Sequence, residues 1–461
     1  MKYINEDAIN DLLNNATRID EARLDEILAK AKSLERLTLK EAAHLLAVQE
    51  PSMLNKIFDA AAFVKNAIYG KRVVLFAPLY ISNYCLNNCA YCAFKADNKA
   101  ITRKALSMAE ITKETQWLLS RGHKRILLVA GESRPKSGAD YYVNAIKAIY
   151  AASVGPHRIR RVNINCAPLS VGEYKKLKAA GIGTYQLFQE TYHEATYRAV
   201  HPQGPKSDPD HRIEAIDQAF LAGIDDVGIG VLYGLYDYKF DTLGLLSHIA
   251  ALERTFKVGP HTISVPRIEP AQGVVFSEHA PYAVSDDDFK KVVAVLRLCV
   301  PYTGIILSTR ESASMRDALF NLGISQASAE SKTAPGAYGA TEVVTSVGAQ
   351  FSTADHRTLD EVMASLLTRG FIPSFCTACY RKERTGEAFM CLAKPGMIKG
   401  KCSVNALITL KEYLDNFASV DVRAQGYRMI ESLRKELPID DQKSVQAIFA
   451  EMQRGKYDEL V

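Results

Sequence analysis

The chain has 461 residues and a formal net charge of +5, and its charged and apolar fractions are those of an ordinary soluble globular protein. So small a charge at this length gives no reason to expect nucleic-acid binding. The N-terminal residues lack the apolar core of a signal peptide, and the apolar runs are too short to span a membrane. We therefore expect a cytoplasmic protein without membrane association.

The first 70 residues are predicted to be helical. Apolar residues recur at helical spacing in 27–34 and 42–48, and no glycine occurs before Gly70. This segment, residues 1–70, is interpreted as an N-terminal helical extension.

From residue 72 onwards, short β-branched runs alternate with helical patterns, which favours parallel βα units. Capping-box spacing at 107–110 and 170–173 marks two helix starts. The predicted strands are 73–79, 125–129, 161–164, 184–188, 226–231, 262–265 and 304–308, with a weaker one at 324–328 or 341–345. The count and length fit a (β/α)8 barrel over residues 71–357, and an open doubly wound sheet is the alternative.

A further helix, 358–369, is predicted to stop at Gly370, and a tail that is largely helical beyond Ala406 follows. Residues 358–461 are therefore interpreted as a small C-terminal domain docked on the barrel. This tail shows little strand signal.

Cysteine usage is the most informative feature of the chain. Clustered cysteines in the reducing cytoplasm indicate metal binding or catalysis and not disulfides. Six of the nine cysteines form two sets of three, which are Cys85, Cys89 and Cys92 in the first set and Cys376, Cys379 and Cys402 in the second. Two such sets in one protein call for two metal centres.

The first set has the spacing C-x-x-x-C-x-x-C and follows directly on the first predicted strand, so it lies at the functional rim of a barrel. Three thiolates can hold three irons of a 4Fe–4S cube and leave the fourth iron open to S-adenosylmethionine (SAM). A structural zinc site would need a fourth ligand, and no histidine is adjacent. Tyr91 lies within this loop, and its ring could stack on the adenine of SAM.

Other polar residues follow later predicted strands. Gly131 allows close backbone approach and Glu132 could hold the SAM ammonium group, although a plain turn is the alternative. Glu190 could bond the ribose hydroxyls and Arg212 the SAM carboxylate. The alternative for these two is a salt bridge at the barrel rim.

Arg310 and Glu311 follow the seventh predicted strand. An arginine there can fork onto a substrate carboxylate, and Glu311 could pair with Arg310 in a rim salt bridge. His261 begins the sixth strand and, by sequence alone, is more readily a satisfied histidine than a ligand. Cys391 lies within the second cysteine set, so a four-cysteine zinc site or a saturated cluster remains possible beside a three-cysteine cluster with an open iron.

Taken together, several motifs resemble the HydG family, the tyrosine lyases that mature FeFe-hydrogenase. They are the first cysteine loop and the segments 189–193, 201–206, 308–311 and 376–381 with Cys402. The resemblance spans nearly the whole chain. Its C-terminal motif is the most specific part, because the related thiazole-synthesis tyrosine lyases lack these cysteines.

The resemblance implies a radical SAM barrel, two 4Fe–4S clusters, SAM, and an additional mononuclear iron on the C-terminal cluster, held by His261. It implies that L-tyrosine is cleaved at Cα–Cβ to p-cresol and dehydroglycine. Dehydroglycine then yields CO and cyanide, which leave as an iron–carbonyl–cyanide unit for the hydrogenase cofactor. Implied partners are a reductant such as ferredoxin or flavodoxin and other hydrogenase maturation proteins. Two alternatives stay open: a thiazole-type tyrosine lyase with a structural C-terminal metal, and a non-catalytic iron–sulfur scaffold.

Overall fold

The structure, a computed structural model, describes residues 1–16, 19–340 and 348–461. At its centre, eight parallel strands of the described chain close into a barrel, because β10 pairs with β1 as well as with β9. These strands are β1 (Arg72–Ser82), β2 (Arg125–Ala130), β5 (Arg161–Asn165), β6 (Tyr185–Gln186), β7 (Val227–Gly230), β8 (Thr262–Ser264), β9 (Gly304–Leu307) and β10 (Gln326–Ser328). The closed (β/α)8 barrel is thus confirmed over the open sheet. The eighth strand is the one expected at 324–328; the other position, 341–345, lies outside the described residues.

Helices surround the barrel, and a small antiparallel hairpin of β3 (Ser153–Val154) and β4 (His157–Arg158) precedes β5. The helices of this region are α5 (Met108–Ser120), α6 (Arg134–Ser137), α7 (Ala139–Ala151), α8 (Val171–Ala179), α9 (Glu194–Val200), α10 (Pro209–Leu221), α11 (Tyr238–Phe256), α12 (Asp286–Cys299) and α13 (Ala313–Leu322). Both predicted capping boxes form, at the starts of α5 and α8. Each satisfies backbone N–H groups that a helix start otherwise leaves unpaired.

The barrel interior is lined by alternate residues of its strands. Phe76, Pro78 and Tyr80 of β1 line one cavity, as expected when every second side chain of a strand points to the same side. Gln186 of β6 and Ser264 of β8 line it as well. The interior is therefore partly polar, whereas the outer faces of the strands pack against the helices in the main hydrophobic core.

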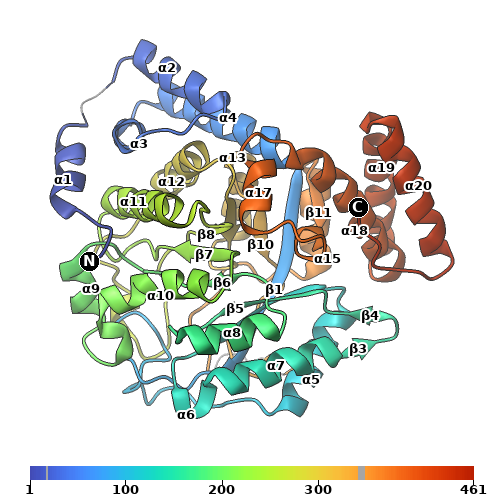
Figure 1. Ribbon diagram of the computed structural model, residues 1–461, viewed down its shortest axis with the longest axis horizontal. Coiled ribbons are helices and arrows are strands. Elements are labelled where there is room, and N and C mark those ends of the chain that lie inside the picture. Colours follow the sequence, from blue (N-terminus) through green and yellow to red (C-terminus); the bar gives the residue numbers. More distant parts are fainter. Residues whose placement is uncertain (17–18, 341–347) are drawn as a thin grey trace.

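The first 70 residues are mainly helical, as the sequence predicts, and the four helices of their described part cover one side of the barrel (Figure 1). They are α1 (Glu6–Asn14), α2 (Glu21–Lys32), α3 (Leu39–Ala47) and α4 (Pro51–Tyr69). These helices contact α11 and α12 of the barrel. α4 ends at Gly70, whose φ of 62° suits glycine, and the chain then enters β1 directly.

The C-terminal residues join the barrel more closely than the sequence indicates. Beyond α15 (Leu359–Thr368), the short strand β11 (Ile372–Ser374) pairs with Arg72 to Val74 at the start of β1. β11 therefore pairs with the first residues of β1, and β2 pairs with β1 only from Ala77 onwards. The sequence conceals this strand because it is three residues long and contains Pro373, which lacks an N–H for the ladder.

Five C-terminal helices of the described residues follow β11, and the last three of them extend to one side of the barrel (Figure 1). The five helices are α16 (Ala378–Arg381), α17 (Gly386–Ala393), α18 (Ile398–Asn416), α19 (Val420–Glu436) and α20 (Ile439–Gln453). α18 packs on β11 and on α4, so the tail contacts the start of the barrel and the N-terminal extension.

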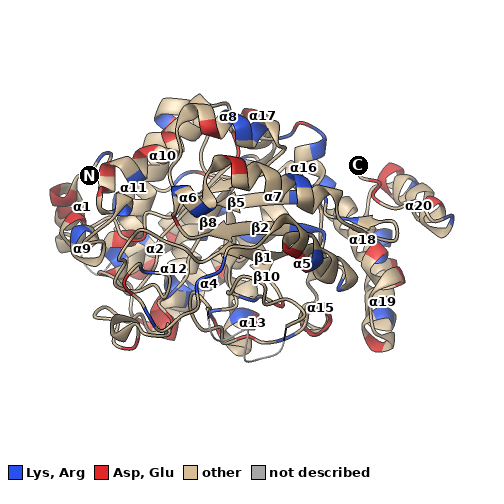
Figure 2. Ribbon diagram, turned by 90° about the horizontal axis from the view of Figure 1, so that it is seen from below, with Lys and Arg blue, Asp and Glu red and all other residues tan. Residues whose placement is uncertain are grey.

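Basic and acidic residues are both spread over the outer helices, in keeping with the small net charge (Figure 2). None of the helices in the described ranges has both the length and the apolar character that crossing a membrane requires.

Candidate active site and second cysteine site

A cavity of about 210 Å³ lies at the C-terminal ends of the barrel strands. It brings together most of the residues that the sequence singles out. These are Cys85, Cys89, Tyr91, Cys92, Gly131, Glu132, Glu190, Arg212 and Arg310. They come from loops far apart in the chain, which meet because the loops after parallel strands converge at one rim of a barrel.

The loop that carries the first cysteines is held in shape by its own polar contacts. The Asn83 amide donates to the Thr102 carbonyl at 2.8 Å, and its oxygen accepts from the Lys104 N–H at 2.6 Å. The Arg103 guanidinium donates to the carbonyls of Asn83 and Phe94 at 2.7 and 2.8 Å. These contacts hold the loop in one conformation.

The donor set of this loop fits an iron–sulfur cluster. Burial raises the pKa of the Cys89 thiol to about 12, so a cation is needed to hold it as a thiolate. No three His, Cys, Asp or Glu side chains within the described ranges have the geometry of a single-ion site. Three cysteines on one loop at the spacing C-x-x-x-C-x-x-C can hold three irons of a 4Fe–4S cube.

Gly131 and Glu132 dock the end of β2 against this loop. A Cβ at Gly131 would lie 2.5 Å from the Tyr84 carbonyl oxygen, so only glycine permits the approach. The Glu132 carbonyl accepts from the Leu86 N–H at 2.8 Å, and its carboxylate accepts from the Asn87 amide at 2.6 Å. Glu132 thus borders the cavity with its carboxylate held in place.

Glu190 is buried between two cations. Its carboxylate lies 2.6 Å from the Lys206 Nζ and 3.7 Å from the Arg212 guanidinium. Burial acts to raise the pKa of Glu190, but the two cations outweigh it and the pKa lies below its ordinary value. Its φ of 74° is left-handed, a strained conformation of the kind that gathers at functional sites. Lys206 also donates to the Tyr91 hydroxyl at 2.9 Å.

The expected pairing of Glu311 with Arg310 does not form. The Glu311 carboxylate instead accepts from Arg267, whose Nε lies 2.9 Å away, and Arg267 also contacts Asp286. Arg310 faces the cavity, with its guanidinium carbon 3.3 Å from the centre of the Phe351 ring. Arg310 lies in the turn after β9 and Glu311 in the bend that follows, and the two side chains reach different partners.

The second cysteine set lies at the opposite end of the barrel. Ser374, two residues before Cys376, is level with Val74 at the start of β1, whereas the first cysteine loop follows Ser82. These two levels are eight residues apart, or roughly 26 Å along a strand. The two cysteine sets therefore occupy separate sites at the two ends of one barrel.

The cysteines of the second set differ in exposure. Cys376 and Cys402 are buried and Cys379 is partly buried, whereas Cys391 is exposed on α17. Burial raises the pKa of the Cys379 thiol to about 12, so this set too needs a cation beside it. The exposure of Cys391 favours a site of three cysteines over one of four.

His261 lies at the same end as the second set, because it precedes β8. Its ring is centred 4.2 Å from the Phe389 ring and 6.0 Å from the ring of Tyr380, the residue after Cys379. The Nδ1 atom lies 3.6 Å from a carboxylate oxygen of Asp226. Both Asp226 oxygens are buried and accept no hydrogen bond from the described chain. At 3.6 Å the contact between His261 and Asp226 is electrostatic and not a hydrogen bond. It places a carboxylate beside one ring nitrogen, on the side where metal-ligating histidines commonly have one.

Several site residues carry no clear sequence signal. Lys206 belongs to the quoted segment 201–206, so the motif contains it without showing its contact with Glu190. Gln350 and Phe351 line the cavity from a loop beyond the last barrel strand. Asp226 directly precedes β7 and begins the predicted strand 226–231, so the sequence gives it no functional signal.

Comparisons with known proteins agree with this geometry. Residues 79–245 match the Radical SAM superfamily, and residues 264–372 match the Biotin and Thiamin Synthesis associated domain. The chain is 45% identical to a crystal structure of HydG, a maturase of the FeFe-hydrogenase, with a TM-score of 0.96 and all of both chains covered. It is 41% identical to the FeFe-hydrogenase maturase HydG from Carboxydothermus hydrogenoformans, with a TM-score of 0.84 and 96% and 97% of the two chains covered.

A match over part of the chain is to an enzyme with a different name. The 2-iminoacetate synthase of Escherichia coli (strain K12) is 33% identical over 346 residues, which is 75% of this chain and 88% of that protein. Similarity over the complete length, by contrast, is to the HydG structures. The chain therefore belongs to the HydG family of FeFe-hydrogenase maturases, within the radical SAM superfamily.

Proposed function

We propose that this protein is a radical SAM tyrosine lyase of FeFe-hydrogenase maturation. It is a carbon–carbon lyase that converts L-tyrosine to p-cresol and dehydroglycine, and then dehydroglycine to CO and cyanide. The observation that carries the proposal is the presence of both cysteine sets, at opposite ends of one barrel, in a chain similar to HydG structures from end to end. The CO and cyanide leave as an iron–carbonyl–cyanide unit.

The first site binds SAM beside a 4Fe–4S cluster held by Cys85, Cys89 and Cys92. When bound and reduced, this cluster supplies the electron that cleaves SAM to methionine and a 5′-deoxyadenosyl radical. The Glu132 carboxylate accepts hydrogen bonds from the SAM ammonium group. Arg212 binds the SAM carboxylate, and its own Nε donates to the Phe188 carbonyl at 3.0 Å.

Two further groups complete this site. Glu190 accepts from the ribose hydroxyls, because Lys206 and Arg212 keep it ionised. The Tyr91 ring packs on the adenine, and its hydroxyl is held by Lys206 and His201 at 2.9 and 2.8 Å.

Arg310 binds the carboxylate of L-tyrosine. Its guanidinium lies in the cavity, stacked on Phe351. One nitrogen donates to the Arg267 carbonyl at 3.3 Å, and the fork of N–H groups on a guanidinium matches a carboxylate. Glu311 does not contact the substrate in this proposal. Its contact with Arg267 fixes the segment after β9 and so positions the neighbouring Arg310.

The second site holds a 4Fe–4S cluster on Cys376, Cys379 and Cys402, with an additional mononuclear iron held by His261. Asp226 orients the His261 ring, and Arg125 secures the cysteine loop by donating to the Cys376 carbonyl at 2.5 Å. The three cysteines of this site lie in the part of the chain beyond the barrel strands, and we assign the site to capture of CO and cyanide. The protein acts in the cytoplasm with a reductant such as ferredoxin or flavodoxin and with other hydrogenase maturation proteins.

The alternative is a thiazole-type lyase with a structural C-terminal metal, which the similarity to 2-iminoacetate synthase supports. A non-catalytic scaffold is disfavoured, because it has no need of the cavity that holds Glu190 and Arg310 beside the cysteines.

The test is anaerobic reconstitution with iron and sulfide quantification and EPR, followed by incubation with SAM, dithionite and L-tyrosine. We expect two clusters, 5′-deoxyadenosine, p-cresol, CO and cyanide. p-Cresol without CO would favour the thiazole-type lyase, and absence of SAM cleavage would favour the scaffold. The variant with alanine for Cys85, Cys89 and Cys92 should keep one cluster and make no 5′-deoxyadenosine.

A further inference from the structure

Gln350 reaches the first cysteine loop from a distant part of the chain. Its Nε2 lies 3.6 Å from the Cys92 Sγ, within hydrogen-bond range for sulfur. Its backbone also joins the same loop, because the Gln350 carbonyl accepts from the Ala93 N–H at 3.3 Å. The side chain thus contacts one of the three sulfurs that the cluster uses.

The orientation of the Gln350 amide is set by a neighbour. The Tyr80 hydroxyl donates to the Gln350 Oε1 at 2.9 Å, so the oxygen is committed and the N–H₂ group faces the sulfur. Tyr80 itself is buried in β1, at the wall of the cavity. An amide held in this way presents a donor to Cys92 without having to rotate.

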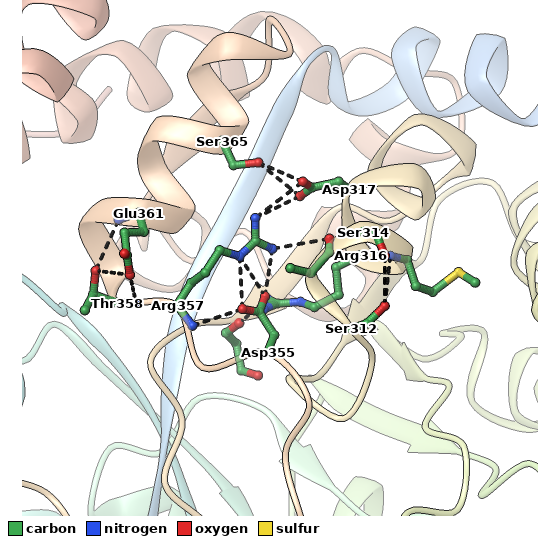
Figure 3. A network of polar contacts seen from close by, with 12 residues as sticks. Ser312, Ser314, Arg316, Asp317, Asp355, Arg357, Thr358, Glu361 and Ser365 are labelled. Atoms are coloured by element: carbon green, nitrogen blue, oxygen red, sulfur yellow. Dashed lines mark hydrogen bonds and ion pairs between the residues drawn. The ribbon is translucent and has the colours of Figure 1, made fainter.

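The segment that carries Gln350 is firmly attached to the barrel. The Gln350 N–H donates to the Thr333 carbonyl at 3.0 Å. A few residues further on, Asp355 forms buried ion pairs with Arg316 and Arg357, and Arg357 reaches on to Asp317 (Figure 3). The Gln350 contact with Cys92 therefore rests on a rigid support.

A second side-chain amide faces the same loop. Asn87 Nδ2 lies 3.7 Å from the Cys85 Sγ, but it also donates to Glu132 at 2.6 Å. Asn87 belongs to the cysteine loop and shapes it, whereas Gln350 comes from outside the loop. A substitution at Gln350 consequently separates an effect on sulfur from an effect on loop folding.

We propose that Gln350 is a positioning residue that donates an N–H to the thiolate of Cys92 and raises the reduction potential of the SAM-cleaving cluster. The inference rests on the proposed function, which places a cluster at this loop. Reduction adds negative charge to the cluster and its sulfurs, and a hydrogen bond to a ligating sulfur stabilises that charge. Gln350 therefore makes the cluster easier to reduce by a physiological donor.

The test is a potentiometric titration, followed by EPR, of full-length reconstituted protein carrying Gln350→Met. Methionine has a similar length but no N–H to donate, so the midpoint potential of the SAM-responsive signal should become more negative. The Tyr80→Phe variant keeps the Gln350 N–H donor but removes the hydroxyl that orients it. Its midpoint potential should shift in the same direction by a smaller amount. An unchanged potential in Gln350→Met, with full cluster content, would overturn the proposal.

Gln203→Met is the matched control. Gln203 accepts from the Asn88 amide at 3.0 Å, so it touches the same cysteine loop, but its partner is not a sulfur. The control should leave the potential unchanged. A shift as large as that of Gln350→Met would show that the loop responds to any lost contact and would contradict a specific role for Gln350.

A second measurement uses no substitution, in case Gln350→Met fails to hold the cluster. Protein labelled with ¹⁵N at glutamine side-chain amides is reduced and examined by pulsed EPR. A ¹⁵N coupling to the SAM-responsive cluster is expected, and its absence would overturn the proposal. If unlabelled wild-type protein holds no SAM-cleaving cluster at all, the proposed function fails instead, so the two failures are distinct.

Discussion

Charged side chains around the first cavity differ in whether they already have a partner. Glu190 lies between Lys206 and Arg212, and Glu311 is held by Arg267. Arg310, by contrast, forms no ion pair with the described residues; burial lowers its pKa, yet a guanidinium stays charged at neutral pH. Its charge is therefore available to a substrate carboxylate.

Replacing Arg310 with lysine should weaken tyrosine binding by about tenfold, while SAM binding is retained. Lysine keeps the charge but not the two parallel N–H groups, and a lost hydrogen bond to a charged group is worth about 1.5–3 kcal/mol. Tyrosine and SAM titrations of the variant measure this directly. Arg198→Lys, on the exposed side of α9, is the control. Unchanged tyrosine affinity in Arg310→Lys would move the carboxylate site elsewhere.

Replacing Asp226 with asparagine should lower the affinity for the proposed additional iron by about 10–100-fold, the range typical of outer-shell partners. The change removes the negative charge behind His261 and leaves the cysteines in place. Iron titration with EPR measures the affinity, and p-cresol formation should continue. Asp225→Asn, at an exposed neighbouring position, should bind iron normally. Equal affinity in both variants would contradict the assigned role of Asp226.

Residue types at the first site could be predicted from sequence because their motifs follow predicted strands. Cys85, Glu132 and Arg310 all reach one rim for that reason. The partner of Glu311 could not be predicted, since the sequence does not show whether its side chain lies beside Arg310 or beside Arg267. Gln350 was not predictable either, because a single polar residue on a loop carries no periodicity.

At the scale of elements, buried polar contacts fix the segments that line the cavity. The network around Asp355 joins α13 to the segment before α15 (Figure 3). The Arg316 and Asp355 side chains are 0% and 1% exposed, so removing one leaves the other charge buried. These contacts stabilise the segment that carries Gln350 and Phe351.

The Asp355→Ala variant should therefore lose about 3–5 kcal/mol of unfolding free energy, the usual cost of leaving a buried charge uncompensated. Denaturant unfolding measures the loss. Arg369→Ala removes an ion pair of the same network whose arginine side chain is 45% exposed, so it should cost at most about 1 kcal/mol. Similar losses in the two variants would show that burial does not set the strength of these pairs.

Asp241, in the first turn of α11, is expected to make stability depend on pH. Burial raises its pKa to about 7. A carboxyl whose folded pKa is raised destabilises the protein as pH rises through the window from its unfolded value to 7. Asp241→Asn, which can still accept from Thr191 and the Tyr192 N–H, should gain roughly 2 kcal/mol over wild type between pH 5.5 and pH 8. Unfolding curves at both pH values test this, and a pH-independent difference would contradict it.

The elements themselves could largely be predicted from sequence. β1, β2 and β5 lie within a few residues of their predicted bounds, because alternating apolar runs and capping boxes mark strands and helices clearly. β11 was missed since Pro373 argues against a strand. Its pairing with β1 depends on tertiary contacts with α18, which no local pattern reveals.

At the scale of the whole molecule, one barrel carries two cysteine sites at opposite ends. The first lies beyond Ser82 at the C-terminal end of β1, and the second lies near Val74, beside β11. Sequence reasoning places the two sets in different domains but not at opposite ends of the barrel, because the position of the tail depends on β11. The arrangement implies that radical cleavage of tyrosine and capture of its products are separate steps.

The most direct test of this division is the double variant Cys376→Ala with Cys379→Ala. The account predicts that it still forms p-cresol from tyrosine, SAM and dithionite, because the first site is intact. It should give no infrared bands of iron-bound CO and cyanide, because the second site is lost. Chromatography for p-cresol and infrared spectroscopy on the same sample separate the two steps. Loss of p-cresol as complete as the loss of iron-bound CO would contradict the two-site account.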